Sequence, residues 1–551
     1  MRDDMTTQSP WLHKLSPAAH PMRMDTLIML TALFLVASAN ISFFAHILAV
    51  YNIGDNIGFV LSTAGVLFGL MWLILQLLCY RFSYRVVLVA MVIIAAVCAY
   101  FTDTYGTVFD KNMLINGLQT DQAEASDLLA PAFFVRVLLL GIVPAFLIIK
   151  TKVELRPWKQ AAIAKAVTML AAVAVVGLCL LPFGDQYASF FRQHKPIRYY
   201  TTPITPVYSA FRLGKDSYDD ATRPTSMIAH AGDAKKVMQA AASSASKPKL
   251  MVFVVGETAR ADHISLNGYP RDTMPRLAKE DNIYSFKQAT ACGTSTAYSV
   301  PCMFSYLNQA DYDIDTADYN ENVLDTLQRL GVTVIWRDNN SSSKGVADRV
   351  SYTDFKEPKT NPVCDVECRD VGMLTGMDKM VDTKAPKDTL IVLHQMGNHG
   401  PAYYKRYPSN FTHFTPVCES NELSQCDQQA VINGYDNALR YTDDFLAQTI
   451  DALKPYADKY DVMMVYMSDH GESLGENNIY LHGLPYQIAP DTQKHVPLII
   501  WSPENNGIDS ARLQAQTTQP ISHDAITPSL LTFFDIQTKE TAGAQTMFTY
   551  K

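Results

Sequence analysis

The first part of the chain alternates between long apolar runs and short polar connections. Five runs are each close to the ~20 residues that an α-helix needs to cross a bilayer, and they lie at 26–50, 57–80, 86–102, 128–149 and 160–183. The first run lacks a small-residue cleavage site after a short apolar core, so it is interpreted as a retained helix. The pattern therefore predicts an all-α, five-helix transmembrane domain over 26–183, preceded by a tail at 1–25.

Basic residues in the connections predict how these helices are oriented, because Lys and Arg concentrate in cytoplasmic loops. The connection after the second run holds Arg81 and Arg85, and the one after the fourth run is also basic. The connection after the first run holds no Lys or Arg, and residues 103–127 hold only Lys111. The tail is then cytoplasmic, and five crossings place residues 184–551 on the opposite side of the membrane.

From residue 249 onward, short strand-like runs alternate with helical segments. Strands are expected at 250–255, 332–336, 389–393, 462–467 and 497–501, and helices near 320–330, 433–454 and 524–534. Apolar strands that alternate with helices predict an α/β domain with a largely parallel sheet over 249–551. Residues 184–248 lack a sustained period and contain AAASSASKPK, so an interfacial segment and a flexible linker are expected there.

Polar groups that can bind a metal follow four of the five expected strands. In chain order they are Glu257, the segment RDNN at 337–340, the pair His394 and His399, and the pair Asp469 and His470. In open α/β sheets the ligand site lies beyond the carboxyl ends of the strands. A polar turn explains any one of these strand ends, but four of them together predict a site.

Glu257, Asp469 and His470 are suited to a zinc ion, because zinc accepts imidazole nitrogen and carboxylate oxygen where no thiolate is offered. The segment ACGTSTAYSVPC at 291–302 offers hydroxyl groups beside them, those of Thr294, Ser295, Thr296 and Ser299. A hydroxyl bound to zinc becomes a stronger nucleophile, and the start of a helix favours an anion. Spacing alone leaves the choice among these hydroxyls open, and a Ser/Thr helix cap is the alternative interpretation.

Six of the nine cysteines lie in the second half of the chain, as the closely spaced pairs Cys292/Cys302, Cys364/Cys368 and Cys418/Cys426. An even number of paired cysteines is typical of disulfides in an oxidising compartment, which agrees with the predicted topology. Six cysteines allow fifteen connectivities, of which pairing between nearest neighbours is favoured. Metal binding by cysteine is the competing interpretation, but neither a CxxC pair nor zinc-finger spacing occurs.

Several segments resemble the lipid A phosphoethanolamine transferases, and in particular the mobile colistin-resistance transferases. They are FVVGETARADH, CGTSTAYSVPCMFSYL, WRDNNSSSKGV, LHQMGNHGPAYYKRYP and SDHGESLGENNIYLHG. The segment TDTYGTVFDKNMLINGLQTDQAEASDLL between the third and fourth runs is similar as well. The resemblance implies a multi-pass protein of the bacterial inner membrane with a periplasmic α/β domain of the alkaline-phosphatase/sulfatase type. It implies phosphatidylethanolamine as the donor and lipid A as the acceptor, and we expect a monomer.

The resemblance also implies roles for single residues. Thr296 matches the nucleophile, which forms a covalent phosphoethanolamine intermediate beside the zinc ligands Glu257, Asp469 and His470. The expected substrate-binding residues are His399 and His482, which match positions that hold the transferring phosphate or a second zinc, Lys344, and the donor-headgroup positions Asn116, Thr120 and Glu124. Relatives with two zinc ions carry Asp where this chain has Gln395, and a neutral amide is a poor replacement. One tight zinc is therefore expected, with a second weak or absent.

The predicted function is zinc-dependent transfer of phosphoethanolamine from phosphatidylethanolamine to a lipid A phosphate, with release of diacylglycerol and resistance to polymyxins such as colistin. One alternative is transfer of another headgroup, such as phosphoglycerol. A second is a metal-binding transporter or receptor, but charged residues buried in the middle of helices, which would favour transport, are few. The net charge of −8 gives no indication of nucleic-acid binding. Sulfatase chemistry needs a Cys/Ser-x-Pro-x-Arg motif, whereas Cys292 is followed by Gly-Thr-Ser.

Overall fold

The structure, a computed structural model, describes residues 21–120, 122–221, 226–237 and 247–551. The chain forms two compact units. The first unit contains the chain up to Asp103 together with Pro131–Tyr208, and the second contains Thr104–Ala130 together with Ser209–Lys551. Most of the expected tail at 1–25 and most of the expected AAASSASKPK linker lie outside the described residues.

The first unit is helical. Its elements are β1 (Met22–Arg23), α1 (Met24–Ala39), α2 (Ile41–Val50), α3 (Ile53–Leu78), α4 (Tyr84–Tyr105), α7 (Pro131–Arg136), the π-helix η2 (Val137–Ile142), α8 (Val143–Lys150), β2 (Val153–Glu154), α9 (Trp158–Leu180) and α10 (Gly184–Gln193). Among the described residues, four helical stretches are long and apolar enough to cross a membrane: Ile53–Leu78, Tyr84–Tyr105, Pro131–Lys150 and Trp158–Phe190.

The first predicted run is two helices instead of one. Helices α1 and α2 meet at 61°, and only if this bent pair is counted as a single span does the number of spans reach five. Asn40 lies at the bend, where its side chain donates to the carbonyl oxygens of Leu35 at 3.1 Å and Thr202 at 2.8 Å and accepts from the backbone N–H of Thr202 at 3.0 Å. The bond to Leu35 satisfies a carbonyl group near the end of α1, and the two bonds to Thr202 join the bend to a distant segment of the same unit.

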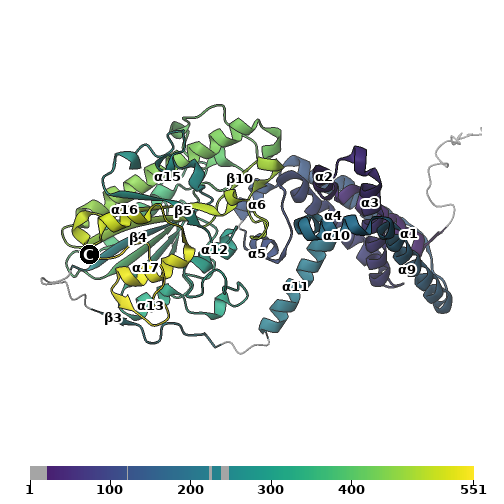
Figure 1. The fold of residues 1–551 in the computed structure, drawn as a ribbon, viewed down its shortest axis with the longest axis horizontal. Coiled ribbons are helices and arrows are strands. Elements are labelled where there is room, and N and C mark those ends of the chain that lie inside the picture. Colours follow the sequence, from purple (N-terminus) through teal and green to yellow (C-terminus); the bar gives the residue numbers. More distant parts are fainter. Residues whose placement is uncertain (1–20, 121, 222–225, 238–246) are drawn as a thin grey trace, which may run out of the picture. The chain divides into compact units, whose positions relative to one another are not determined.

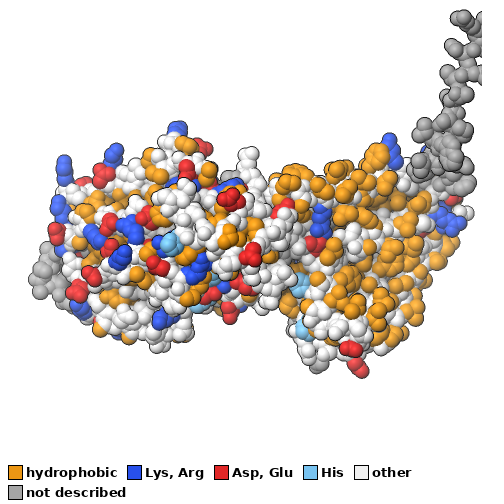
Figure 2. Space-filling model, turned by 90° about the horizontal axis from the view of Figure 1, so that it is seen from above, with side chains coloured by type: hydrophobic (Ala, Val, Ile, Leu, Met, Phe, Trp, Pro, Cys, Tyr) orange, Lys and Arg blue, Asp and Glu red, His pale blue; other side chains and the backbone are white. Residues whose placement is uncertain are grey.

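Large apolar side chains cover the surface of this helical unit, as the orange areas of Figure 2 show. Leu61, Phe82, Leu170 and Leu178 are among those that are mostly exposed. Soluble monomers rarely expose contiguous apolar patches larger than a few hundred Å². The surface is therefore typical of helices that contact lipid.

The second unit is built on an eight-stranded sheet with the order β13-β5-β12-β9-β4-β8-β6-β7. All five strands predicted from the sequence are present: β4 (Lys249–Gly256), β6 (Thr333–Asp338), β8 (Thr389–His394), β9 (Asp461–Ser468) and β12 (His495–Trp501). Three short or half-exposed strands were not predicted: β5 (Ile283–Thr290), β7 (Ser351–Asp354) and β13 (Ile521–Ser522).

The expectation of a largely parallel sheet is confirmed. β4 pairs in parallel with β8 and β9, and β6 pairs in parallel with β7 and β8, whereas β12 is antiparallel to β5 and β9. The carboxyl ends of β4, β6, β8 and β9 therefore meet at one edge of the sheet, while β12 ends at the opposite edge. This direction explains why the fifth predicted strand ends without polar site residues.

Helices cover both faces of the sheet, and each central strand is buried on both faces. In β4, the alternate residues Met251, Phe253 and Val255 belong to one core cluster with Leu324 and Leu530. These two leucines lie on α13 (Val323–Arg329) and α17 (Ile526–Phe533), whereas α15 (Gln428–Leu453) lies on the other side of the sheet (Figure 1). Continuous apolar strands are what a parallel sheet covered on both faces requires.

The remaining elements of the second unit lie at the sheet edges and in the connections. They are α5 (Lys111–Gln119), α6 (Gln122–Leu128), β3 (Lys235–Lys236), α12 (Thr296–Met303), α14 (Met377–Met380), β10 (Ser473–Leu474), β11 (Tyr480–Leu481), α16 (Ser510–Gln516) and β14 (Ile536–Gln537). Helix α11 (Ile204–Ala221) begins in the first unit and ends in the second. Three disulfides join nearest-neighbour cysteines, as expected: Cys292–Cys302, Cys364–Cys368 and Cys418–Cys426.

Replacement of Phe253 by Ala tests this core. Phe253 is only 1% exposed in the central strand β4, and truncation of a buried Phe typically costs about 3–5 kcal/mol. We expect Phe253→Ala to lower the unfolding midpoint of the second unit, measured by thermal denaturation of the full-length protein. Val366→Ala is the control, because Val366 is 74% exposed. Equal midpoints for the two variants would contradict this account of the core.

Candidate metal centre and active site

Three potential metal ligands meet at the carboxyl ends of β4 and β9. Glu257 follows β4, and Asp469 and His470 follow β9. One ligand atom from each residue lies within 4.8 Å of the other two, and all three residues are buried. His470 Nε2 lies 3.6 Å from Glu257 Oε1 and 3.4 Å from Asp469 Oδ2. The parallel pairing of β4 with β9, which places Gly256 opposite Ser468, brings the three residues together.

The protonation chemistry of this group fits a bound cation. Glu257 Oε1 and Asp469 Oδ2 are buried and accept no hydrogen bond from the described part of the chain. Burial, followed by the nearby charge of Asp469, raises the pKa of Glu257 well above its usual range. Two adjacent buried carboxylates with free oxygens are costly unless a cation compensates them. The donor set of two carboxylates and one imidazole suits zinc.

His470 is oriented as a metal ligand. Its Nδ1 lies 2.9 Å from the carbonyl oxygen of Gly471, so Nδ1 carries the proton and Nε2 presents its lone pair to the two carboxylates. Burial lowers the pKa of His470 to about 4. The imidazole is therefore neutral at physiological pH, which is the form that binds a metal.

Thr296 is the hydroxyl that reaches this group. It is the first residue of α12, and its Oγ1 lies 3.1 Å from Glu257 Oε2 and 3.3 Å from His470 Nε2. Thr294 instead donates its hydroxyl to the carbonyl oxygen of Leu484, and the hydroxyl of Ser299 accepts the backbone N–H of Gly293. Of the hydroxyls that the sequence left open, the geometry thus singles out Thr296.

Two supporting residues were not assigned individual roles from the sequence. Asn340 donates from Nδ2 to Glu257 Oε2 at 2.7 Å and to the carbonyl oxygen of Gln395 at 2.7 Å, so it orients the carboxylate of Glu257. His523 joins two distant segments, because its Nδ1 accepts from the N–H of Cys292 and its Nε2 contacts the carbonyl oxygen of Ser468. Asn340 belongs to the strand-end segment RDNN, which was predicted to lie at the site. His523 lies far from every recognised motif.

The backbone around Glu257 is held in an unusual conformation. Thr258 has φ of +53°, which is unfavourable for a β-branched residue. Hydrogen bonds from its N–H to Asp469 Oδ1 and from the Tyr435 hydroxyl to its carbonyl oxygen hold it there. Gly397 packs against Glu257 so closely that an added Cβ would lie 3.0 Å from the carbonyl oxygen of Glu257. Strain of this kind is typical of a site whose ligands are fixed in advance.

Gln395 and His394 do not join the ligand group. The Gln395 amide donates to Asp370 Oδ2 at 3.3 Å, and Asp370 also accepts the N–H groups of Met396 and Gly397. His394, which the strand-end pattern included, is buried against Asp338 with Nδ1 3.0 Å from the carboxylate. Both residues bond to aspartates instead of contributing to the metal group.

The segment 104–130, which lies between apolar helices in the sequence, belongs to the compact unit that carries the site. Glu124 Oε1 lies 2.9 Å from His399 Nε2. Burial by itself raises the pKa of Glu124, but the charge and hydrogen bond of His399, with the charge of Lys344, outweigh it and lower the pKa to about 2. Burial likewise lowers the pKa of His399, but Glu124 outweighs burial and raises it to about 9. The two residues form a charged pair at neutral pH.

The other expected substrate-binding residues surround this pair. The ring centre of His482 lies 4.2 Å from that of His470 and 5.4 Å from that of His399, and His482 Nδ1 lies 2.8 Å from Glu472 Oε2. His470, Glu472 and His482 form a second group with metal-binding geometry. Lys344 Nζ donates to the carbonyl oxygen of Gln119 at 3.1 Å.

Asn116 lies in the C-terminal half of α5 and Thr120 is the residue that caps its end, and α5 packs against α12. The hydroxyl of Thr120 donates to the carbonyl oxygen of Asn116 at 2.9 Å. Segment 104–130 is thus in contact with Lys344, with His399 and with the helix that Thr296 begins.

Asp127 anchors segment 104–130 close to His399. Its carboxylate accepts from Lys405 at 2.5 Å and from Arg406 at 2.9 Å. Arg406 also pairs with Glu367 and donates from Nε to the carbonyl oxygen of His399 at 2.6 Å. Arg406 is buried, so it needs both carboxylates to offset its desolvation.

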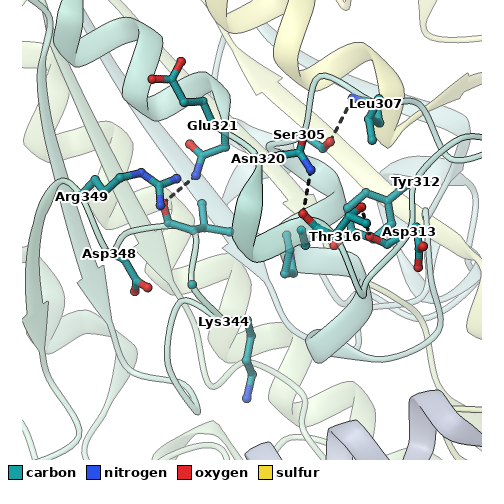
Figure 3. Close-up of a pocket in the computed structure, with 15 residues that line it drawn as sticks. Ser305, Leu307, Tyr312, Asp313, Thr316, Asn320, Glu321, Lys344, Asp348 and Arg349 are labelled. Atoms are coloured by element: carbon teal, nitrogen blue, oxygen red, sulfur yellow. Dashed lines mark hydrogen bonds between the residues drawn. The ribbon is translucent and has the colours of Figure 1, made fainter. Parts of the chain in front are cut away.

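A small pocket lies beside Lys344, between the residues that follow α12 and those around 345–349 (Figure 3). Its volume is about 50 Å³, which accommodates a few water molecules but no lipid headgroup. In one wall of the pocket the side-chain amide of Asn320 donates to the backbone carbonyl oxygen of Thr316 at 2.7 Å. Lys344 extends away from Arg349 and Asp348 (Figure 3). The pocket does not include Thr296 or the metal group.

Comparisons with known proteins agree with this geometry. The sulfatase family matches residues 249–536, just over half of the chain, and the family described as phosphoethanolamine transferase EptA/EptB matches residues 67–218. The second unit is therefore an enzyme domain of the sulfatase class, joined to a helical unit of the EptA/EptB type.

Similar proteins define the family more closely. Phosphatidylethanolamine transferases Mcr-2 and Mcr-1 of Escherichia coli are 54% and 52% identical to this chain, over 93% of it and over 95% and 94% of their own lengths. The solved structure of the integral membrane protein lipooligosaccharide phosphoethanolamine transferase A (EptA) from Neisseria meningitidis matches with a TM-score of 0.87 and 34% identity. That match covers 95% of this chain and 97% of the other. The chain belongs to the phosphoethanolamine transferase family.

Replacement of Asp127 by Asn tests the anchoring of segment 104–130. Loss of one carboxylate leaves the buried Arg406 incompletely paired, and removing one partner of a buried ion pair typically costs about 3–5 kcal/mol. We expect faster tryptic cleavage in segment 104–130 and lower transferase activity in Asp127→Asn. Asp272→Asn is the matched control, because the Asp272 side chain is 65% exposed. Wild-type cleavage rates and activity in Asp127→Asn would show that this contact does not hold the segment.

Proposed function

We propose that this protein transfers phosphoethanolamine from phosphatidylethanolamine to a phosphate group of lipid A, through a covalent intermediate on Thr296. The main support is the position of the Thr296 hydroxyl, which lies at the start of a helix and within 3.3 Å of both Glu257 and His470. Similar proteins named phosphatidylethanolamine transferases support the donor. More distant relatives named Kdo(2)-lipid A phosphoethanolamine 7''-transferases support the acceptor class.

We propose that one tightly held zinc ion occupies the site of Glu257, Asp469, His470 and Thr296. The orphaned carboxylate oxygens and the neutral imidazole described above support this assignment. When bound, zinc lowers the pKa of a coordinated hydroxyl and polarises a phosphoryl oxygen. A second zinc is proposed to be weak or absent, because Gln395 offers an amide where a carboxylate would bind, and its Nε2 bonds to Asp370.

The reaction has two displacement steps in this proposal. The Thr296 oxygen attacks the phosphorus of phosphatidylethanolamine, and the bond from phosphorus to the diacylglycerol oxygen breaks, which releases diacylglycerol. A phosphate oxygen of lipid A then attacks the phosphorus of the intermediate, and the bond to the Thr296 oxygen breaks. The proton that Thr296 loses in the first step is balanced by the proton that diacylglycerol gains. In the second step Thr296 regains the proton that the singly ionised lipid A phosphate loses when its oxygen attacks.

His399 is proposed as the acid that protonates the leaving diacylglycerol oxygen. Its pKa of about 9 keeps a proton on the ring at neutral pH, and its ring lies next to that of His482. His482, the other candidate, already has Nδ1 bonded to Glu472. A general acid must hold its proton at the working pH and reach the leaving atom.

Segment 104–130 is proposed to bind the donor headgroup through Asn116, Thr120 and Glu124, with Lys344 on the phosphate. Glu124 is a carboxylate held ionised next to the site, so it can attract the ammonium of phosphoethanolamine. This carboxylate pairs with His399. The ammonium is proposed to approach Glu124 without displacing His399, so that Glu124 continues to hold the proton on His399.

We further propose a bacterial inner-membrane protein with a cytoplasmic N-terminus and a periplasmic catalytic domain that acts as a monomer. The distribution of Lys and Arg supports the orientation, and three disulfides outside the apolar helices agree with an oxidising compartment. Transfer of phosphoglycerol is the second candidate, but family membership favours phosphoethanolamine.

Replacement of Thr296 by Ala separates the nucleophile from the metal ligands. We expect Thr296→Ala to retain zinc and to lose transfer activity by about 10³-fold or more, as removal of a catalytic nucleophile typically does. Asp469→Ala is expected to lose both zinc and transfer activity, because it removes one of the three ligands that Thr296→Ala leaves in place. The measurements are zinc content and transfer to lipid A by purified full-length protein. Ser295→Ala is the control, since Ser295 precedes α12 without capping it through its side chain. An active Thr296→Ala variant would require a different nucleophile.

Expression in a polymyxin-susceptible Gram-negative host tests the cellular outcome. A phosphate monoester carries roughly −1.5 to −2 charge at pH 7, and phosphoethanolamine addition leaves two singly charged phosphates and one ammonium, or about −1. Each basic group near an anionic membrane gains about 1 kcal/mol, so a polycationic drug binds less tightly. We expect higher polymyxin tolerance and a lipid A mass increase of one phosphoethanolamine unit with wild type, and neither with Thr296→Ala or Glu257→Ala.

Three results would change the assignment. Tolerance without the mass increase would indicate a general envelope response. A mass increase that corresponds to phosphoglycerol would favour the second candidate. No change in lipid A with well-expressed, zinc-loaded protein would exclude lipid A as the acceptor.

A further inference from the structure

The helical unit contains a cavity that shares no residue with the active site. Its volume is about 370 Å³, and it is lined by the start of α1, the turn between α3 and α4, the connection from β2 to α9, and the first turns of α9. The short parallel pairing of β1 with β2, Met22 with Val153 and Arg23 with Glu154, holds two of these segments together. Several Lys and Arg side chains lie at this end of the largely apolar unit (Figure 2).

The lining of this cavity is cationic. It contains Arg23, Arg81, Arg156 and Lys165 against the two acidic residues Asp25 and Glu154, a balance of four positive and two negative charges. Among the described residues, none of these three arginines forms a hydrogen bond or ion pair with another side chain. A cluster of this kind favours an anionic partner.

Lys165 adds an ammonium group to the lining of this cavity. It lies on the apolar helix α9, and its ammonium donates to the carbonyl oxygen of Cys79 at 3.1 Å and lies 3.4 Å from the ring centre of Tyr80. Neither partner is a carboxylate. The ammonium is therefore held at the cavity by a dipole and an aromatic face, and its full charge remains to be compensated.

A second space of mixed lining adjoins the cavity along α9. Its volume is about 510 Å³, it shares Arg23, Asp25 and Arg156 with the first, and it is lined further by the apolar Ile163, Ala164 and Val167 and by the polar Thr26, Gln160 and Thr168. Phe82, Trp158 and Ile163 are 83%, 74% and 65% exposed. Arg23 and Arg156 thus lie where the largely apolar first cavity meets this second space. A phospholipid fits this arrangement with its phosphate at the junction and its acyl chains along the apolar residues of the first cavity and of α9.

We propose that this cavity binds an anionic glycerophospholipid of the membrane leaflet at which the chain begins. The phosphate would lie among Arg81, Arg156 and Arg23, and the aromatic side chains of Tyr80, Phe82 and Trp158 suit the interface between headgroups and acyl chains. The excess of positive charge favours a lipid with a net negative headgroup over a zwitterionic one. The description of this leaflet as cytoplasmic rests on the proposed topology, but lipid binding itself does not.

Binding of phosphatidylglycerol to delipidated full-length protein, measured by native mass spectrometry, tests this site. We expect wild type to retain one phosphatidylglycerol in preference to phosphatidylcholine. Arg81→Gln/Arg156→Gln should weaken phosphatidylglycerol binding about 30-fold, from about 1 kcal/mol for each basic residue and 1.4 kcal/mol for each tenfold change. Lys150→Gln/Lys152→Gln is the matched control, because it removes the same charge from the adjacent connection outside the cavity and should change binding less than threefold.

Three outcomes would contradict the proposal. Unchanged binding in Arg81→Gln/Arg156→Gln would place the lipid elsewhere, and equal weakening in the control would mean attraction by overall surface charge. Displacement of the lipid by inorganic phosphate would indicate a site for free anions. Retained transfer to lipid A by the cavity variant shows that it is folded. If the double variant does not fold, Arg81→Gln and Arg156→Gln alone should each weaken binding about fivefold, and wild-type affinity in both would overturn the proposal.

Discussion

The burial of two carboxylates side by side is the constraint on which the catalytic unit depends. Glu257 and Asp469 follow neighbouring parallel strands, and each has a buried oxygen without a hydrogen-bond partner among the described residues. The surrounding structure holds this costly arrangement in place. Asn340 orients one carboxylate, the N–H groups of Thr258 and His470 bind the other, and the positive φ of Thr258 allows the strand end to turn. A site fixed in this way is organised in advance, so little reorganisation remains for a reaction there.

The same site extends into a segment that the sequence places among the membrane helices. Residues 104–130 bring Glu124 to His399 and Asp127 to Arg406, and Arg406 binds the backbone of His399 in turn. The charged pair and the buried arginine thus connect this segment to an imidazole beside the metal group. Residues that are distant in the sequence from the sheet thus take part in the network around the candidate site.

The two units differ in how their charged residues are distributed and paired. The catalytic unit buries acidic and basic groups in compensated networks, of which Arg406 with Asp127 and Glu367 is one example. The helical unit exposes apolar side chains over most of its surface and gathers cations at one end. The first pattern gives fixed catalytic geometry, and the second suits a surface whose partners are lipids, which can supply both the apolar contacts and the negative charge that the protein lacks.

From the sequence alone one could predict the class of fold, the five strands that lie in or next to the buried centre of the sheet, the favoured disulfide pairs and the three residues of the candidate metal group. These features are local, because each arises from an apolar run, from the residues that end it or from closely spaced cysteines. Only the tertiary structure showed that the hydroxyl of Thr296, and not that of a neighbour, contacts the metal group. The bend between α1 and α2 and the antiparallel direction of β12 were likewise decided by the tertiary structure alone. It also brought in His523, Asp127 and Arg406, which reach the site from distant segments. Contacts between such segments depend on strand order and side-chain packing, and neither is visible in the periodicity of a single sequence.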